Sequence, residues 1–292
     1  MLWPKTLIKK MDCGVALARY TTFKIGGKAD LYFEPQNNRQ LSQALRSAAG
    51  KIPVFILGAG SNILVSDNGV AGLVIRLCRA NFRKVALRGG SVRCGCGLPL
   101  SKFAQIAKNN GLSGAEFLIG IPGTVGGAIL MNAGAWGSSI ADIIEEIQVM
   151  GYNGKIKLLK KNSVKFGYRC SGLEKYIILS AKFRLFPESK AAVAGLMREY
   201  LHRRIATQNT RLANAGCIFK NPAASSAGKL IDQCGLKGFS VGDAVVCRKH
   251  ANFILNRGKA KSADILELMR IIRASVRCKF HLNLQPEIKI WH

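Results

Sequence analysis

The stretch that decides the fold of this 292-residue chain is Gly120-Ile121-Pro122-Gly123-Thr124-Val125-Gly126-Gly127. It follows an apolar segment and leads into residues 128–133, where the pattern allows a short helix. A glycine loop that ends at a helix N-terminus offers backbone amides to an anion. Close packing of a helix on a sheet, without a ligand, is the alternative explanation for these glycines.

A second glycine loop, Gly58-Ala59-Gly60-Ser61-Asn62, directly follows the apolar run 53–57, which we expect to be a buried strand. Its glycines allow close approach to a phosphate, and Ser61 and Asn62 add side-chain donors. It is not the dinucleotide fingerprint, because the third glycine and the immediate helix are missing. Two such loops in one α/β region favour a cofactor that contains a diphosphate.

Hydrophobic periodicity predicts an α+β architecture. Expected helices span residues 38–50, 98–110, 189–207, 225–234 and 262–280. Expected strands span residues 30–35, 53–57, 72–77, 143–150, 155–159, 176–186, 251–255 and 284–290. Asn153-Gly154 is predicted to form a hairpin turn, and the polar stretch 208–214 a linker that follows a domain boundary near residue 206.

The composition, with 48% hydrophobic and 21% charged residues, is that of a globular protein and excludes a disordered or fibrous chain. The charge is unusual, since 44 Lys and Arg against 16 Asp and Glu give +28. Such an excess suggests acidic partners. Two stretches, residues 76–93 and 155–165, are basic and free of acidic residues, but neither is interleaved with aromatic residues. We therefore do not expect specific nucleic-acid binding.

The nine cysteines are odd in number and irregularly spaced, and no secretory signal precedes them, so we expect free thiols and a cytoplasmic protein. Cys94-Gly95-Cys96 has no second Cys/His pair at zinc spacing, and no metal site is expected. Residues 117–141 contain no charge, yet their glycines, Pro122 and Asn132 suit a buried loop better than a membrane-spanning helix.

An ordered set of motifs resembles the UDP-N-acetylenolpyruvoylglucosamine reductase family, also called UDP-N-acetylmuramate dehydrogenases. Besides the two glycine loops, the motifs that match are Thr21-Thr-Phe-Lys-Ile-Gly-Gly27, Asn132-Ala-Gly-Ala135, Phe166-Gly-Tyr-Arg169, Ala215-Gly-Cys-Ile-Phe-Lys-Asn-Pro222, Gly228-Lys-Leu-Ile-Asp232, Gly235-Leu-Lys-Gly238, His250-Ala-Asn-Phe253 and Pro286-Glu287. The resemblance covers residues 17–290.

The resemblance implies a vanillyl-alcohol-oxidase-like (PCMH-type) FAD-binding fold in two subdomains, residues 1–80 and 81–205. A C-terminal α+β substrate-binding domain would span residues 206–292. It also implies non-covalent FAD and NADPH as reductant. The reaction would reduce UDP-N-acetylglucosamine enolpyruvate to UDP-N-acetylmuramate, a peptidoglycan precursor, and we expect a monomer. The residues that would bind FAD are Gly58, Ala59, Gly60, Ser61, Asn62, Gly120, Pro122, Gly123, Thr124, Gly126, Gly127, Asn132 and Gly134.

Three residues match the family's catalytic positions. Hydride addition to an enol ether beside a carboxylate builds negative charge, so a cation and a proton donor should stabilise it. Arg169 would supply the cation and Glu287 a catalytic carboxyl group, although either could be an ordinary surface residue. Cys217 stands where the family usually has a serine proton donor. A thiol with a pKa of about 8.5 is mostly protonated at neutral pH and can donate, but a small buried hydrophobe is the alternative.

Tyr168, Lys220 and Asn221 match positions near the substrate, although a solvated lysine is the alternative for Lys220. His250 matches a recurrent position and is at least as well explained as a structural histidine. Gln285 replaces a frequent second acid, and the interval from Arg169 to Cys217 is too short for the tyrosine-bearing insertion of one subclass. Two rival functions remain, namely another FAD-linked oxidoreductase and an inactive relative that binds nucleic acid.

Overall fold

The computed structural model describes residues 5–208, 212–223 and 225–292. Residues 209–211 of the predicted linker lie outside that set. The chain forms two compact units that are interleaved in sequence. Unit 1 comprises Met1–Cys13, Leu31–Ala59 and Gly72–Arg204, and unit 2 comprises Gly14–Asp30, Gly60–Ala71 and Ile205–His292. No helix of the described residues is long and apolar enough to span a membrane.

A four-stranded sheet lies near the N-terminus in the order β1-β2-β5-β3. Its strands are β1 (Met11–Ala16), β2 (Lys28–Phe33), β5 (Val70–Arg76) and β3 (Val54–Leu57). Strands β3 and β5 are parallel and pair Leu57 with Arg76, so their carboxyl ends lie side by side. The glycine loop at Gly58 therefore begins beside the end of β5.

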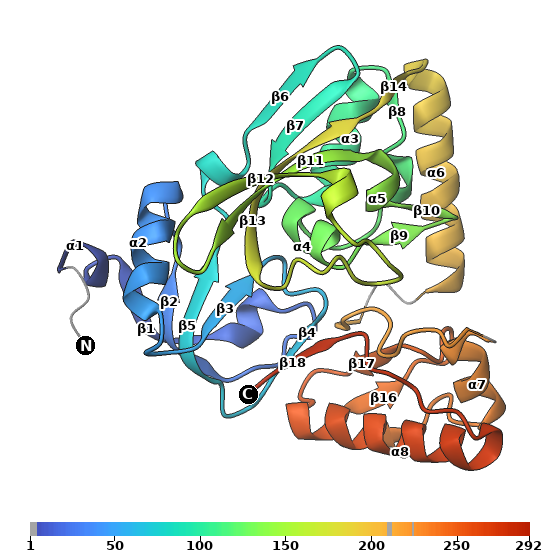
Figure 1. Ribbon diagram of the computed structural model, residues 1–292. Helices are drawn as coiled ribbons and strands as arrows, with labels where there is room; N and C mark the ends of the chain where they lie inside the picture. The colour runs from blue at the N-terminus through green and yellow to red at the C-terminus, as the bar shows by residue number, and fades with distance from the viewer. Residues whose placement is uncertain (1–4, 209–211, 224) are drawn as a thin grey trace. The chain divides into compact units, whose positions relative to one another are not determined.

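Helix α2 (Asn38–Ala48) belongs to the same part of unit 1 (Figure 1). Its N-cap is Asn37, whose side chain accepts a hydrogen bond from the Gln40 amide at 3.0 Å. Leu41, Ala44 and Leu45 recur at helical spacing and are almost completely buried. The residues whose spacing predicted this helix are thus the ones that pack against the core.

A five-stranded sheet forms the centre of unit 1 in the order β12-β11-β13-β7-β6 (Figure 1). Its strands are β12 (Ile156–Lys160), β11 (Ile144–Gly151), β13 (Tyr176–Arg184), β7 (Ser91–Gly95) and β6 (Val85–Arg88). Adjacent strands in it are antiparallel. The other elements of unit 1 are α1 (Lys5–Ile8), α3 (Leu100–Asn109), β8 (Leu112–Ser113), α4 (Val125–Leu130), β9 (Gly134–Ala135), β10 (Ser138–Ser139), α5 (Ile140–Ile143), β14 (Phe186–Pro187) and α6 (Lys190–Thr207), whose last residues continue into unit 2.

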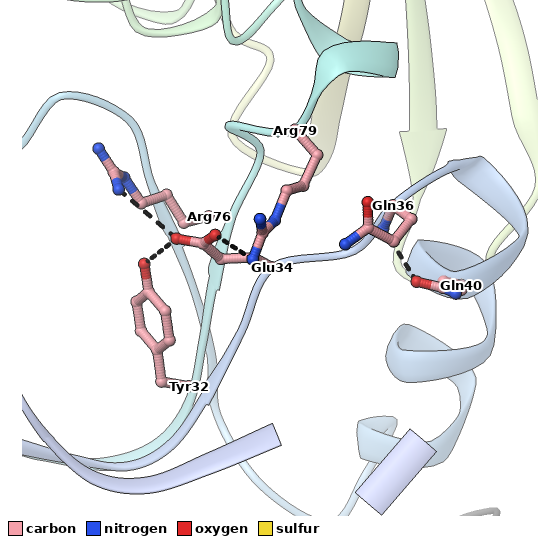
Figure 2. Close-up of polar contacts among 6 residues, drawn as sticks. All are labelled: Tyr32, Glu34, Gln36, Gln40, Arg76 and Arg79. Carbon is pink, nitrogen blue, oxygen red and sulfur yellow. Dashed lines mark hydrogen bonds and ion pairs between the residues drawn. The ribbon is translucent and has the colours of Figure 1, made fainter. Parts of the chain in front are cut away.

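An ionic cluster lies at the carboxyl ends of β2 and β5 in unit 1 (Figure 2). The carboxylate of Glu34 accepts a hydrogen bond from the Tyr32 hydroxyl at 2.7 Å and contacts the guanidinium groups of Arg76 at 3.5 Å and Arg79 at 3.0 Å. Burial raises the pKa of Glu34, but hydrogen bonds from Tyr32 and Cys78 and the two arginines outweigh it and leave the pKa lowered. The carboxylate is therefore ionised at neutral pH.

Unit 2 is built around the long helix α8 (Ser262–Phe280), which packs against α7 (Ala227–Gln233) and a three-stranded sheet (Figure 1). The sheet has the order β15-β16-β17, with strands β15 (Ser240–Val241), β16 (Ala244–Val246) and β17 (Ile254–Asn256). The last strand, β18 (Lys289–Trp291), pairs in parallel with β4 (Ile63–Val65). The pairing joins the end of the chain to the segment that follows Asn62.

The structure confirms the predicted α+β class and all five long predicted helices within a few residues, with α8 exactly as expected. The Asn153-Gly154 turn is also confirmed, since the Gly154 amide donates to the Gly151 carbonyl at 2.8 Å. Two predicted strands are wrong in extent. The strand expected over 251–255 is β17 at Ile254–Asn256, and the strand expected over 284–290 is β18 at Lys289–Trp291. Pro286 has no amide hydrogen for a regular ladder, so Glu287 precedes the last strand.

Candidate active site

The two glycine loops approach each other within unit 1. A Cβ placed on Gly58 would lie 3.0 Å from Oγ1 of Thr124, so a larger residue would crowd the contact. Thr124 is the N-cap of α4, and its hydroxyl accepts from the Gly127 amide at 3.4 Å. The helix begins at Val125, earlier than the expected 128–133, because Thr124 caps it. Gly58 and the Thr124 cap of α4 are therefore neighbours at the end of β3.

Gly60, in the remainder of the first loop, occupies a position that only glycine fits. Gly60 has φ of +65°, and a Cβ there would collide with the carbonyl oxygen of Tyr20. Its own carbonyl accepts from the Thr22 amide at 3.0 Å. The glycine therefore lets the loop lie against the Thr21-Thr22 segment, which belongs to another of the matching motifs.

A turn at Tyr168-Arg169 and the segment that contains Asn132 and Gly134 are held together in unit 1. The amide and carbonyl of Gly167 pair with those of Cys170, which leaves Tyr168 and Arg169 at the tip. Nδ2 of Asn132 donates to the Gly167 carbonyl at 2.9 Å, and the Arg169 guanidinium donates to the Gly134 carbonyl at 3.3 Å. The structure thus unites Asn132, Gly134 and Arg169, which the sequence assigned to two different roles.

The backbone of Arg169 is strained, with φ of +55° in the left-handed region. A non-glycine residue in that region costs on the order of 1 kcal/mol and persists only where its surroundings hold it. Its guanidinium carbon lies 5.3 Å from the centre of the half-exposed Tyr168 ring. Such strain marks the turn as a candidate functional site, since ordinary surface loops rarely retain it.

In unit 2 the segments around Cys217 and Glu287 are neighbours. The Glu287 amide donates to the Ile218 carbonyl at 2.8 Å, and the Lys220 amide donates to the Gln285 carbonyl at 2.9 Å. Asn62, from the first glycine loop, donates through Nδ2 to the Glu287 carbonyl at 3.3 Å. One predicted proton donor, one predicted catalytic carboxyl residue and one predicted cofactor residue therefore occupy the same hydrogen-bonded patch.

The backbone beside Cys217 is fixed by Asn252, which is 1% exposed. Its side chain accepts from the Phe219 amide at 3.0 Å and donates to the Phe219 carbonyl at 2.8 Å. The half-buried Cys217 also packs against Phe253 and Cys247, so it contributes to a small apolar cluster as well. Our sequence reasoning did not single out Asn252, although it lies within the His250-Ala-Asn-Phe253 motif.

The predicted substrate residues of this unit adjoin Cys217 in the chain. Lys220 is half-buried, whereas Asn221 is exposed and its Oδ1 accepts from the Ala227 amide at 3.0 Å, at the start of α7. His250 lies edge-on to Phe253 with ring centres 4.7 Å apart, and burial lowers its pKa. A neutral histidine packed in this way supports the structural interpretation of His250.

Trp136 has a backbone conformation that the hydrophobic pattern did not predict. It has φ of +58° in the turn between β9 and β10, and its ring stacks on Tyr200 of α6 with centres 5.6 Å apart. A bulky residue in the left-handed region is rare. The adjacent Gly137, also at positive φ, was the available signal for a tight turn.

Comparison with known proteins identifies the family of this chain. Residues 208–291 match the family described as "UDP-N-acetylenolpyruvoylglucosamine reductase, C-terminal domain", and residues 29–160 match an "FAD binding domain". A reductase of this name from Symbiobacterium thermophilum is 45% identical over 94% of this chain and 90% of its own length. One from a Synechococcus species is 40% identical over 96% and 91%. The chain belongs to the UDP-N-acetylenolpyruvoylglucosamine reductase family.

The family's solved structures agree with this assignment. The crystal structure of the reductase from Thermus caldophilus superposes with a TM-score of 0.84, at 38% identity, and covers 95% of this chain and 98% of that one. The predicted family and its FAD-binding fold are therefore confirmed. The division into subdomains at residue 80 and the roles of individual residues stay predictions.

Proposed function

We propose that this protein uses FAD and NADPH to reduce UDP-N-acetylglucosamine enolpyruvate to UDP-N-acetylmuramate in peptidoglycan precursor synthesis. The observation that best supports this proposal is the match of nearly the whole chain to the reductase family. Two local arrangements at the expected motifs agree with it: the turn at Tyr168-Arg169 (the arginine turn) and the neighbouring segments around Cys217 and Glu287 (the thiol–carboxyl patch). FAD, when bound, would accept hydride from NADPH and deliver it to the enolpyruvyl double bond.

The chemistry of the glycine loops suits the diphosphate of FAD. Gly58 lies against the Thr124 hydroxyl at the end of β3, and the backbone amides of such a loop can donate to phosphate oxygens. Gly58, Ala59 and Thr124 are thus the residues that we expect to hold the diphosphate.

Arg169 would bind the carboxylate of the enolpyruvyl group. Charge grows on that carboxylate when hydride adds to the double bond, and a planar guanidinium stabilises it in a bidentate manner. The contact with the Gly134 carbonyl and the strained turn would keep the guanidinium oriented before the substrate arrives. Less reorganisation is then needed as charge develops.

Cys217 would protonate the carbon beside the carboxylate. The thiol hydrogen moves to that carbon as the carbon–carbon double bond becomes single, and the resulting thiolate regains a proton from solvent before the next turnover. Glu287, held beside Ile218, would provide a second group that orients or relays this proton. Lys220, Tyr168 and Asn221 would contact the UDP-sugar.

We further propose that the protein acts as a cytoplasmic monomer with NADPH as the preferred nicotinamide. The test of the function is a visible spectrum of the purified protein under anaerobic conditions. We expect a flavin spectrum that bleaches with NADPH and returns only after addition of UDP-N-acetylglucosamine enolpyruvate. A colourless protein that takes up no FAD contradicts the proposal, and bleaching without return points to another electron acceptor.

A further inference from the structure

The charge of +28 exceeds what FAD, NADPH and a UDP-sugar require, which leaves positive charge for a further acidic partner. The hairpin of β11 and β12 stands out, because residues 147–173 contain no Asp or Glu and the two glutamates at the start of β11, Glu145 and Glu146, are ion-paired with residues outside the hairpin. Lys155, Lys157 and Lys160 on this hairpin are exposed, and they form no ion pair with other described residues. Their charge is therefore available to a partner.

Apolar side chains lie among these lysines. Ile156 and Leu158 are 45% and 56% exposed, and their spacing of two residues places them on the same face of β12. Strand β12 is at the edge of its sheet. Tyr152, at the hairpin turn, is 39% exposed. By the same alternation Lys160 shares the face of Ile156 and Leu158, whereas Lys157 projects from the opposite face of this edge strand. An exposed aliphatic pair with lysines on both sides and an aromatic residue at the turn suits a lipid interface.

Helix α2 extends this basic surface within unit 1. The Ser42 hydroxyl donates to the Gly154 carbonyl at 3.2 Å, which fixes the hairpin turn against the helix. An open hollow of about 340 Å³ beside this contact is lined by Arg39, Ser42 and Arg46, among others, and both arginines are exposed. A phosphate-bearing headgroup would find two guanidinium groups there.

We propose that the β11–β12 hairpin and the adjoining face of α2 bind the surface of an anionic lipid bilayer. Lysines and arginines would contact headgroup phosphates while Ile156 and Leu158 enter the boundary of the acyl chains. Nucleic acid is a weaker match, because two aliphatic side chains gain nothing from a phosphate backbone and one tyrosine is no stacking platform. The proposal is independent of the reaction that the protein catalyses.

The test is co-sedimentation of the full-length protein with vesicles at physiological salt. We expect binding to vesicles that contain phosphatidylglycerol and none to pure phosphatidylcholine. Replacing two lysines (K157Q/K160Q) should lower the partition constant roughly 30-fold, because each lysine near an anionic surface contributes about a factor of five. Replacing the aliphatic pair (I156S/L158S) should lower it on the order of tenfold.

Matched controls separate this surface from the overall charge. The variant R273Q/R277Q removes two exposed charges from α8, and F239S removes an exposed aromatic residue from unit 2. Both should bind vesicles like the parent protein, and all four variants should keep the parent's thermal midpoint and turnover. Equal loss in R273Q/R277Q and K157Q/K160Q overturns the proposal. So does unchanged vesicle binding by I156S/L158S, or binding to duplex DNA in place of vesicles.

Discussion

The arginine turn of unit 1 and the thiol–carboxyl patch of unit 2 hold their proposed catalytic residues in place by different means. Arg169 lies in a strained turn whose geometry depends on side-chain bonds from Asn132 and on its own bond to Gly134. Cys217 and Glu287 lie on neighbouring extended segments joined by main-chain hydrogen bonds. The first arrangement is held by side chains of the turn and its neighbour, whereas the second combines main-chain bonds with bonds from the side chains of Asn252 and Asn62. We therefore expect a serine at position 217 to keep the backbone geometry of this patch.

The largest expected effect is that of Cys217→Ala. Removing a positioned proton donor costs about 10²- to 10⁴-fold in rate, so turnover should fall by at least about 100-fold. Cys217→Ser should keep measurable activity, because a hydroxyl can donate and the main-chain bonds stay. Steady-state oxidation of NADPH that depends on substrate measures both. Wild-type turnover in Cys217→Ala would refute the donor assignment.

Arg169→Lys should have the next largest effect. Lysine keeps the charge but loses the planar fork, so we expect a loss of about 100-fold in kcat/KM for the enolpyruvyl substrate. Reduction of the bound flavin by NADPH should be unchanged. A variant that loses both activities equally would place Arg169 in cofactor binding or folding instead.

Asn132→Ala tests the dependence of the turn on its neighbours. Oδ1 accepts from the Ala141 amide at 3.1 Å, and Nδ2 bonds to Gly167, so the change leaves two backbone groups without these partners. We expect unfolding free energy to fall by about 2 kcal/mol and substrate turnover to fall roughly tenfold. Asn132→Gly, which relieves φ of +42° but also lacks the amide, is the control. Equal rates in wild type and Asn132→Ala would show that Arg169 is held in place without it.

The smallest expected effect concerns the ionic cluster around Glu34. Its pKa is lowered in the folded protein, so its contribution to stability is complete above the unfolded pKa and is lost as the pH falls through the folded pKa. The Arg79 side chain is 49% exposed, and the contribution should be about 1 kcal/mol or less. Unfolding of Glu34→Gln and of the exposed control Glu174→Gln between pH 7 and pH 3 measures it. A deficit of Glu34→Gln that persists unchanged at pH 3 would contradict this assignment.

Local periodicity sufficed for the five long predicted helices but not for the short helices or for all strands. Helix α8 was predicted exactly, because its buried face repeats at helical spacing along 19 residues. Strands β6 and β7 were not predicted, since Arg88, Gly89 and Gly90 interrupt any alternation and only pairing with β13 makes them strands. The extent of β18 depends on β4, which lies far away in the sequence.

For the candidate active site too, local features were predictable and long-range contacts were not. Motif order was enough to nominate Arg169, Cys217 and Glu287 and the glycine loops, because each motif is local. The bonds between them join residues that are distant in sequence, such as Arg169 with Gly134 and Asn62 with Glu287. Neither periodicity nor spacing reports such bonds, and for the same reason the strained Trp136 and the buried Asn252 were missed.

We propose that Arg169 and Cys217 act in the same step, the transfer of hydride from reduced flavin to substrate. Single-turnover spectroscopy of Arg169→Lys and Cys217→Ala tests it most directly, by timing bleaching with NADPH and the return of colour with substrate in separate anaerobic mixings. We predict that both variants bleach at the wild-type rate and regain colour at least about 100-fold more slowly. Return of colour at the wild-type rate in either variant would contradict the claim.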